Sequence, residues 1–435
     1  MEKYSNYKDS SVDWIGDIPQ YWDIKKVKFV GNVMPSNVDK KTVEGEQQID
    51  LCNYVDVYKN DFITADMAFM TATASDSQIE KFSLKAGDVI ATKDSEDPTD
   101  IAVPAFVPKD IQGVICGYHL TLMRPDANQL NGNFLFWLIK STYYNQFFST
   151  QANGITRYGI GTYSFKNVPI ILPSINEQKH IAHYLNTKTA KIDKLISDKE
   201  RLTELLNEEC IAIINQAVTR GIDLNVPMKD SAIDWLGDVP RHWQVKRMKY
   251  LCDIGTGDKD TENREDDGAY PFYVRSQTIE RISSYSFDGE AILTAGDGVG
   301  VCKVWHYVDG KFDYHQRVYR MSDFKEVSGK YLYYYLKYNF EKEVKKLSAK
   351  STVDSLRRPM FQNFLVSFGS ITEQASIVNY VEAEEKRIEN IIDKTKQEIE
   401  LLKEYKTSLI SEVVTGKVDV RNEVIPETGY LTLAS

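Results

Sequence analysis

The chain has 435 residues, too many for one ordinary hydrophobic core, so the sequence predicts two or more domains. Hydrophobic residues make up 42% and aromatic residues 11%, a composition that excludes wholesale disorder. The net charge of −10 argues against a simple nucleic-acid binder, which usually carries an excess of Lys and Arg, unless its positive charge is gathered locally.

Cysteine usage and hydropathy predict a cytoplasmic protein. The five cysteines are scattered without a CxxC pair, as is typical of reduced thiols: Cys52, Cys116, Cys210, Cys252 and Cys302. The polar N-terminal segment lacks the apolar core of a secretory signal, and no stretch approaches the ~18 apolar residues of a membrane span. We expect no contact with a membrane.

The first recognisable element, residues 8–28, is repeated without a gap at residues 229–249. Two tryptophans, a glycine, an aspartate and a proline recur: Trp14, Gly16, Asp17, Pro19 and Trp22 match Trp235, Gly237, Asp238, Pro240 and Trp243. Paired tryptophans favour core packing over a ligand site. We therefore expect a small hydrophobic clasp at the start of each half of a duplicated chain.

Each clasp is followed by a globular half with short strands and tight turns. The strand-turn pattern KAGDVIAT (85–92) matches DGEAILTA (288–295), and the aromatic run FLFWLIK (134–140) resembles YLYYYLK (331–337). These patterns predict α/β (α+β) halves with mixed sheets and one aromatic helix each.

A long charged helix closes each half. The segment PSINEQKHIAHYL (173–185) is echoed by GSITEQASIVNYV (369–381), and the two runs end alike at QAVTRG (216–221) and EVVTGK (412–417). Apolar residues recur at steps of three, four and seven, which is typical of a coiled-coil helix.

The helix starts and lengths lead to further expectations. Ser174 with Glu177, and Ser370 with Glu373, predict a reciprocal capping box at each start. About 43 residues at ~1.5 Å each would give a rod of ~65 Å, whose apolar stripe has to be buried. The other long helix is the obvious partner, and short connections require the pair to run antiparallel. We expect an antiparallel coiled coil and a pseudo-twofold relation between the halves.

The sequence contains no convincing nucleotide or methyl-transfer motif. Gly296, Gly298 and Gly300 form a GxGxG, but the following VCKVWHYV alternates like a strand, whereas a dinucleotide site requires a helix N-terminus there. A turn is therefore favoured. A Walker A sequence and the NPP[YF] tetrad of amino-methyltransferases are also absent.

Metal-ligand patterns are equally weak. His180 and His183 lie at i, i+3, and Cys302, His306 and His315 lack the paired spacing of a zinc site. Surface or packing roles are favoured for all five side chains. We expect no catalytic residue, no cofactor and no metal in this chain.

Several of these segments together resemble the specificity subunit of a type I restriction–modification system. They are the repeated DWIGDIP (13–19) and DWLGDVP (234–240), the PSINEQ and GSITEQ helix starts, and the closing EVVTGKVDVR. The resemblance runs from about Lys8 to Arg421. It implies five segments: target-recognition domain 1 (1–173), spacer helix 1 (174–221), target-recognition domain 2 (222–369), spacer helix 2 (370–420) and a C-terminal tail (421–435).

The resemblance also implies a function. Each globular half would read one half-site of a bipartite target in double-stranded DNA, and the helices would set the gap between the half-sites. The helices would also dock two modification (methyltransferase) subunits that bind S-adenosylmethionine, and restriction subunits would join the full complex. The chain itself would be non-catalytic, which agrees with the missing motifs.

Local charge indicates where DNA could be contacted. Residues 275–358 carry 15 Lys and Arg against 11 Asp and Glu. The loops at 151–165 and 348–361 combine arginine with polar side chains that can read base edges. The candidate DNA-binding residues are Lys93, Arg124, Asn153, Thr156, Arg157, Tyr158 and Lys166 in the first half, and Arg275, Arg281, Lys303, Arg317, Arg320, Arg357 and Arg358 in the second.

The helices are the expected docking surface for protein partners. The candidate docking residues lie in their first turns: Glu177, Gln178, Ile181, Leu185, Glu373, Gln374, Ile377 and Val381. Residues 31–172 remain acidic, with 16 Asp and Glu against 11 Lys and Arg. We therefore expect tight DNA binding to require the modification subunits.

Two other classes of protein are considered. A structural coiled-coil scaffold with two globular heads would have no sequence-specific effect on DNA and would not copurify with a methyltransferase. An enzyme with unrecognised catalysis in one half would be active without partners and would lose activity through one substitution.

Overall fold

The computed structural model describes residues 2–347 and 355–425, and the chain divides into two compact units. Unit 1 comprises Met1–Lys199 and Gln397–Ser435, and unit 2 comprises Glu200–Lys396. Each long helix therefore contributes residues to both units, whereas the predicted domains end where the helices begin.

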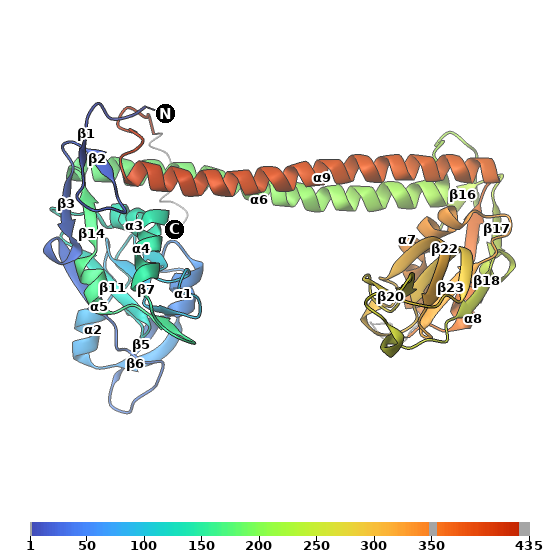
Figure 1. The fold of residues 1–435 in the computed structure, drawn as a ribbon, viewed down its shortest axis with the longest axis horizontal. Helices are drawn as coiled ribbons and strands as arrows, with labels where there is room; N and C mark the ends of the chain where they lie inside the picture. Colours follow the sequence, from blue (N-terminus) through green and yellow to red (C-terminus); the bar gives the residue numbers. More distant parts are fainter. Residues whose placement is uncertain (1, 348–354, 426–435) are drawn as a thin grey trace. The chain divides into compact units, whose positions relative to one another are not determined.

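An antiparallel sheet forms the centre of unit 1. Its four strands are ordered β4 (Gly31–Pro35), β11 (Leu120–Pro125), β7 (Val89–Thr92) and β9 (Pro104–Phe106). Helix α3 (Gly132–Lys140) packs on β7 and β9. Figure 1 labels α3 and β7 among the elements of unit 1. Every side chain from Phe134 to Ile139 in this helix is buried, so the predicted aromatic helix is confirmed.

A second sheet of unit 1 is mixed. Its order is β10 (Val114–Cys116), β5 (Gln47–Cys52) and β6 (Met70–Ala74), with β10 parallel and β6 antiparallel to β5. The other elements of unit 1 are short: β1 (Tyr7–Asp9), β2 (Asp17–Pro19), β3 (Asp23–Lys26), η1 (Val27–Phe29), α1 (Tyr54–Lys59), α2 (Asp76–Phe82), β8 (Asp94–Ser95), α4 (Thr142–Gln151), β12 (Asn153–Gly154), β13 (Tyr158–Gly159), α5 (Thr162–Asn167) and β14 (Pro169–Leu172).

Unit 2 is built on one six-stranded sheet. Its order is β18 (Asp253–Thr256), β23 (Val318–Ser322), β21 (Phe287–Ala295), β22 (Trp305–Tyr314), β19 (Tyr270–Tyr273) and β20 (Ile279–Ile282). The aromatic helix α7 (Gly329–Leu347) packs on β21 and β22. The remaining elements are β15 (Met228–Asp230), β16 (Asp238–Pro240), β17 (Gln244–Arg247), η2 (Met248–Tyr250), η3 (Thr261–Asn263), η4 (Gly298–Gly300), α8 (Arg358–Asn363) and β24 (Leu365–Phe368).

The two units share a sheet topology. The order β4-β11-β7-β9 in unit 1 corresponds to β18-β23-β21-β22 in unit 2, and all six pairings are antiparallel. In both units an aromatic helix covers the third and fourth of these strands. This common core confirms the predicted duplication of an α/β half with mixed strand pairing, and the units differ in the strands added around it.

The tryptophan pairs pack as the sequence predicted. Trp22 and Trp243 are fully buried. Trp14 stacks on Phe147 with ring centroids 5.0 Å apart, and Trp235 stacks on Phe364 at 5.9 Å. Aromatic stacking of this kind fixes the start of each half against a later part of the same unit, helix α4 in unit 1 and the end of helix α8 in unit 2.

Helix α6 (Ile175–Arg220) and helix α9 (Ile371–Val414) pack antiparallel within each unit. In unit 1, Lys406 Nζ lies 2.7 Å from Asp193 Oδ1 and Lys199 Nζ lies 2.5 Å from Glu398 Oε2. In unit 2, Leu206 forms a buried cluster with Ile388 and Ile392. The predicted antiparallel pairing is confirmed in both units, and α9 ends at Val414 although residues 370–420 were predicted as helix.

The glycine-rich segment after β21 is not a nucleotide-binding turn. Residues Gly298–Gly300 form one turn of 3₁₀ helix, and the next element is the ten-residue strand β22. The predicted strand is confirmed from Trp305 onward, whereas residues 301–304 lie before the strand and include a turn. No group of three or more His, Cys, Asp or Glu side chains suited to a metal ion occurs in residues 2–347 and 355–425. None of the described helices is both long and apolar enough to cross a membrane.

The starts of the two long helices correct one expectation. Ser174 Oγ accepts from the Glu177 amide at 3.3 Å, and Ser370 Oγ accepts from the Glu373 amide at 3.2 Å. The two glutamates do not complete reciprocal caps, because their carboxylates bind aromatic residues of the clasp. Tyr4 and Tyr21 donate to Glu177, and Trp243 Nε1 donates to Glu373 at 2.8 Å.

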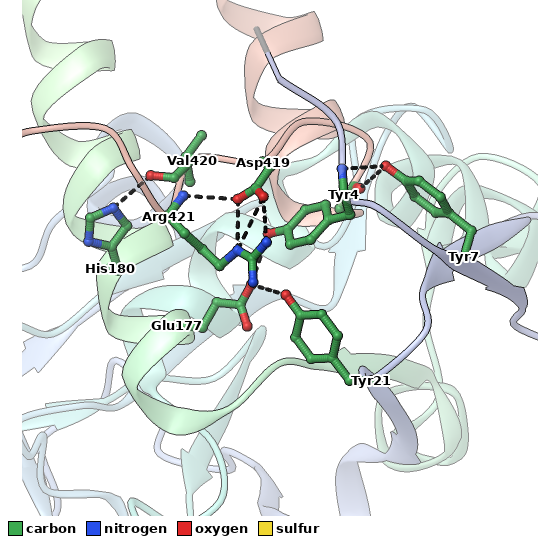
Figure 2. Close-up of polar contacts among 9 residues, drawn as sticks. Tyr4, Tyr7, Tyr21, Glu177, His180, Asp419, Val420 and Arg421 are labelled. Atoms are coloured by element: carbon green, nitrogen blue, oxygen red, sulfur yellow. Dashed lines mark hydrogen bonds and ion pairs between the residues drawn. The ribbon is translucent and has the colours of Figure 1, made fainter.

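Figure 2 shows that the N-terminal segment, with Tyr4, and the segment after helix α9, with Asp419 and Arg421, meet beside Glu177. The Tyr4 hydroxyl donates to Glu177 at 2.9 Å, and the guanidinium of Arg421 lies over the Tyr4 ring. Arg421 is held by an ion pair with Asp419 at 2.7 Å. Burial, followed by the charge of Glu177, raises the pKa of Tyr21 to about 12, so both tyrosines stay protonated as donors.

Most of the residues predicted to dock a partner are buried within their own units, and their role in docking stays a prediction. The Glu373 side chain is 27% exposed. The other seven residues are buried: Glu177, Gln178, Ile181, Leu185, Gln374, Ile377 and Val381. Gln178 bonds the backbone of Gln129, Asn131 and Pro173, and Gln374 bonds the corresponding positions in unit 2. The spacing of apolar residues along a helix predicts which face is buried, but it does not predict whether that face packs within its own unit or against a partner.

Candidate nucleic-acid interface

In unit 1 the end of strand β7 organises a cluster of charged and polar side chains. Lys93, the residue after the strand, bonds on both sides through its backbone. Its amide donates to the carbonyl of His119 at 3.0 Å, and its carbonyl accepts from the amide of Ile160 at 2.8 Å. Three segments distant in sequence are thereby joined beside the next residue, Asp94.

The Asp94 carboxylate binds the side chains of His119 and Arg157. Its Oδ2 lies 2.5 Å from Nδ1 of His119, and its Oδ1 accepts from Nη2 of Arg157 at 2.6 Å. The Asp94 side chain is 15% exposed, whereas that of Arg157 is 57% exposed. We call Asp94, His119 and Arg157 the Asp94 cluster. Its carboxylate is shielded and its guanidinium faces solvent.

Arg157 belongs to a tight hairpin formed by β12 and β13. Gly154 has φ +153°, and a Cβ there would lie 2.0 Å from the Arg157 carbonyl oxygen, so only glycine fits. The turn exposes Asn153 and Thr156 and leaves Ile155 92% exposed, while Tyr158 is half-buried. Amide, guanidinium and aliphatic groups at one tip are those that can contact base edges and thymine methyl groups.

The other candidates of unit 1 differ in exposure. The Lys93 side chain turns inward, donating to the Ser36 carbonyl at 3.1 Å, and burial lowers its pKa. Arg124 forms a two-armed bond with the buried Asp88 at 2.8 Å, which gives it a role within the fold. Lys166 is exposed on α5. The structure thus brings Asn153, Thr156, Arg157 and Tyr158 together and leaves Arg124 and Lys93 facing inward.

Unit 2 repeats the backbone arrangement at the end of β21. The amide of Gly296 donates to the carbonyl of Arg317 at 2.7 Å, and its carbonyl accepts from the amide of Leu356 at 2.7 Å. Gly296 therefore takes the place of Lys93, and Arg317 takes the place of His119. The segment 348–354, which includes part of the second predicted loop, lies outside the described residues.

Asp297 is the corresponding carboxylate of unit 2. Its Oδ1 accepts from Nη1 of Arg275 at 3.1 Å, and its Oδ2 lies 3.7 Å from Nε of Arg317. The arginine side chains are 46% and 65% exposed, against 25% for Asp297. We call these three residues the Asp297 cluster.

A buried histidine, His315, binds the backbone of Arg317 in the Asp297 cluster. His315 Nδ1 accepts from the Arg317 amide at 2.9 Å, and the side chain is 3% exposed. Burial, followed by the charge of Arg275, lowers the pKa of His315, so its ring is neutral and can accept this bond.

The remaining candidates of unit 2 fall into two groups. Lys303, Arg357 and Arg358 are exposed, the last two at the start of α8. Arg281 donates to the carbonyls of Gly268 and Ala269, and the guanidinium of Arg320 lies 4.1 Å from the centre of the Phe287 ring. The contacts of Arg281 and Arg320 hold strands together, which favours a structural role for both.

Sequence reasoning missed Asp94, His119 and Asp297. A signal was present, because the matched segments 85–92 and 288–295 both continue for two residues to an aspartate. His119 gives no such signal: its match with Arg317 rests on backbone bonds between separate strands.

Known proteins resemble this chain over most of its length. The family description "Type I restriction modification DNA specificity domain" matches residues 19–204 and 240–401. A putative type I restriction enzyme MjaX specificity subunit from Methanocaldococcus jannaschii is 21% identical over 96% of this chain and 98% of its own length. The type I restriction enzyme EcoDI specificity subunit from Escherichia coli is 25% identical over 42% of this chain, which spans 40% of the EcoDI subunit.

Solved structures share the fold. The crystal structure of the HsdS subunit from Thermoanaerobacter tengcongensis covers 92% of this chain and 98% of its own, with a TM-score of 0.59 and 16% identity. A chain from a type I R-M system, solved for its complex assembly and conformational transition, gives a TM-score of 0.64 at 16% identity, with 92% and 99% covered.

The duplicated α/β fold carries one specificity domain of the matched family in each half, which gives the chain two target-recognition domains. The family match covers both halves, and the chain belongs to the type I restriction–modification DNA specificity subunits. Its role is therefore DNA sequence recognition, and the alternative of a structural scaffold without a role on DNA is not supported.

Proposed function

We propose that this chain reads a bipartite DNA target, with one half-site for each unit, and directs methylation by two partner subunits. The observation that carries the proposal is the pair of matching clusters, the Asp94 cluster after strand β7 and the Asp297 cluster after strand β21. The backbone arrangement is the same in both units, but the side chains differ: His119 and Arg157 surround Asp94, while Arg317 and Arg275 surround Asp297. A common backbone with different donors suits two readers of different sequences.

The chemistry of methyl transfer would belong to the partners. Modification subunits would supply S-adenosylmethionine, and a restriction subunit would join for cleavage, while this chain, acting in the cytoplasm, would supply sequence recognition without catalysis. The long helices would set the gap between half-sites. Because the first turns of both helices are buried in their own units, partners would dock on later turns, where Leu195, Leu205 and Leu401 are 44%, 45% and 63% exposed.

Methylome sequencing tests the proposal directly. The chain is expressed with its modification subunits, and genomic methylation is compared with that of cells carrying the modification subunits alone. We expect a two-part motif with unspecified central bases that appears only when the chain is present. Methylation of the same motif without the chain, or a contiguous motif, would contradict the proposal.

A second measurement separates recognition from catalysis. The purified chain with S-adenosylmethionine and target DNA is expected to transfer no methyl group, and activity should appear only after modification subunits are added. Methyl transfer by the chain alone, abolished by a single substitution, would identify it as an enzyme.

A further inference from the structure

The strongest unassigned feature is the shared position of Asp94 and Asp297. Strand β7 runs antiparallel to β11, and β21 runs antiparallel to β23. In both units the aspartate lies two residues beyond the end of the strand, which is Thr92 in β7 and Ala295 in β21. The residue in between, Lys93 or Gly296, joins the strand to two other segments through its backbone hydrogen bonds. Neither aspartate was among the candidate DNA-binding residues.

The third segment occupies an equivalent place in both units. In unit 1, Gly159 pairs with Asp94 just before helix α5. In unit 2, Ser355 forms a bridge with Asp297 just before helix α8. The same three-segment junction therefore surrounds both carboxylates, although their cationic partners come partly from different segments.

The two clusters present their charges alike. In each, the carboxylate is the least exposed member, at 15% for Asp94 and 25% for Asp297, and an arginine is 46% exposed or more. A guanidinium fixed by a carboxylate loses side-chain freedom before binding, which lowers the entropic cost of placing its remaining donors. The carboxylate also reduces the attraction of that arginine to phosphate, so the restrained donors are better suited to base edges than to the backbone.

We infer that Asp94 and Asp297 are equivalent positioning residues, each of which orients the arginine side chains that read one half-site of the DNA target. This inference rests on the proposed function and specifies which residues carry its selectivity. Arg157 contacts a base in the half-site of unit 1, and Arg275 and Arg317 contact bases in the half-site of unit 2. The partner of each cluster is a base edge with two acceptors, such as that of guanine.

The two half-sites act as internal controls for each other. The chain is coexpressed with its modification subunits as wild type, Asp94→Asn or Asp297→Asn, and the methylated motifs are sequenced. Asparagine keeps the shape of the side chain and removes the charge that holds the arginines. We expect Asp94→Asn to raise methylation of sites with one changed base in one half-site by about ten-fold, with the other half-site unchanged. Asp297→Asn is expected to do the reverse.

Matched variants separate positioning from general stability. Asp193→Asn removes an ion pair with Lys406 on the long helices, and Glu280→Gln alters a half-buried carboxylate of unit 2 that lies 3.9 Å from Arg264. Both are expected to leave the motif unchanged. Arg157→Lys and Arg275→Lys keep the positive charge but lose the two-pronged donor, and each should relax the same half-site as its aspartate variant.

The outcomes are decisive in both directions. Unchanged motifs in both aspartate variants, or equal relaxation of both half-sites by either one, would overturn the inference. If an aspartate variant fails to fold, the lysine variant of that unit decides, and full selectivity in it also overturns the inference. A wild-type chain that directs no bipartite methylation would instead refute the proposed function itself.

Discussion

Two glycines terminate the long helices in the left-handed region, but their surroundings differ. Gly416 has φ +73° and Gly221 has φ +78°. A Cβ on Gly416 would lie 2.4 Å from Cδ of Pro19, whereas at Gly221 the nearest atom would be 3.5 Å away, on Trp243. Only unit 1 therefore combines backbone strain with a steric clash.

This difference predicts unequal effects of one substitution. Gly221→Ala should destabilise unit 2 by ~1–2 kcal/mol through the left-handed backbone alone. Gly416→Ala should cost unit 1 a further ~1–3 kcal/mol, because Pro19 has to move. Hydrogen exchange of amides near Trp22 and near Trp243 measures the two units separately. Equal losses of protection would show that the clasp of unit 1 yields without cost.

His315 predicts a pH dependence for unit 2. Burial and then Arg275 lower its pKa, while Asp260 and Asp297 oppose the shift. Below the ordinary value of 6.5 the unfolded chain binds the proton and the folded one resists it, so stability falls as pH drops through 6.5 toward the folded pKa. His315→Asn keeps an acceptor for the Arg317 amide and should flatten the pH dependence, measured by denaturant unfolding between about pH 7.5 and 5.5. An unchanged slope in this variant would assign the effect to another group.

At the scale of elements, the long helices were the most predictable feature of the sequence. Their apolar stripes, capping serines and closing glycines are local signals, and α6 and α9 begin within one residue of the predicted positions. The Glu177 and Glu373 side chains were the exception. A capping box depends on a glutamate that has no better partner, and the clasp supplies tyrosine and tryptophan donors instead.

Helix length predicts the gap of the DNA target. Seven residues inserted into each helix, after Lys199 and before Glu398, keep the apolar stripe in register and add ~10 Å. The gap should lengthen by about three base pairs at ~3.4 Å each, as read from the methylome. The same insertion between the exposed Asp266 and Asp267 of unit 2 is the control and should leave the gap unchanged. A constant gap in the helix variant would refute the role of the helices as a spacer.

At the scale of the whole molecule, the net charge of −10 limits how the chain can meet DNA. Carboxylates also neutralise part of the local positive charge, since Asp94 and Asp297 pair with the exposed arginines. The isolated chain should therefore bind target DNA weakly, and modification subunits should raise its affinity at least ~100-fold in a gel shift at fixed salt. Tight and specific binding by the chain alone would contradict this expectation.

The sequence by itself determined the duplication, the clasps, the long helices and the family, because each rests on local spacing or on repeats within the chain. Only the tertiary structure decided which charged residues share a site. Arg124 and Arg157 look alike in sequence, yet one is bound to the buried Asp88 and the other stands at an exposed hairpin. Strand pairing brings His119 beside Asp94 and Arg317 beside Asp297, and such pairing joins segments whose proximity no local pattern records.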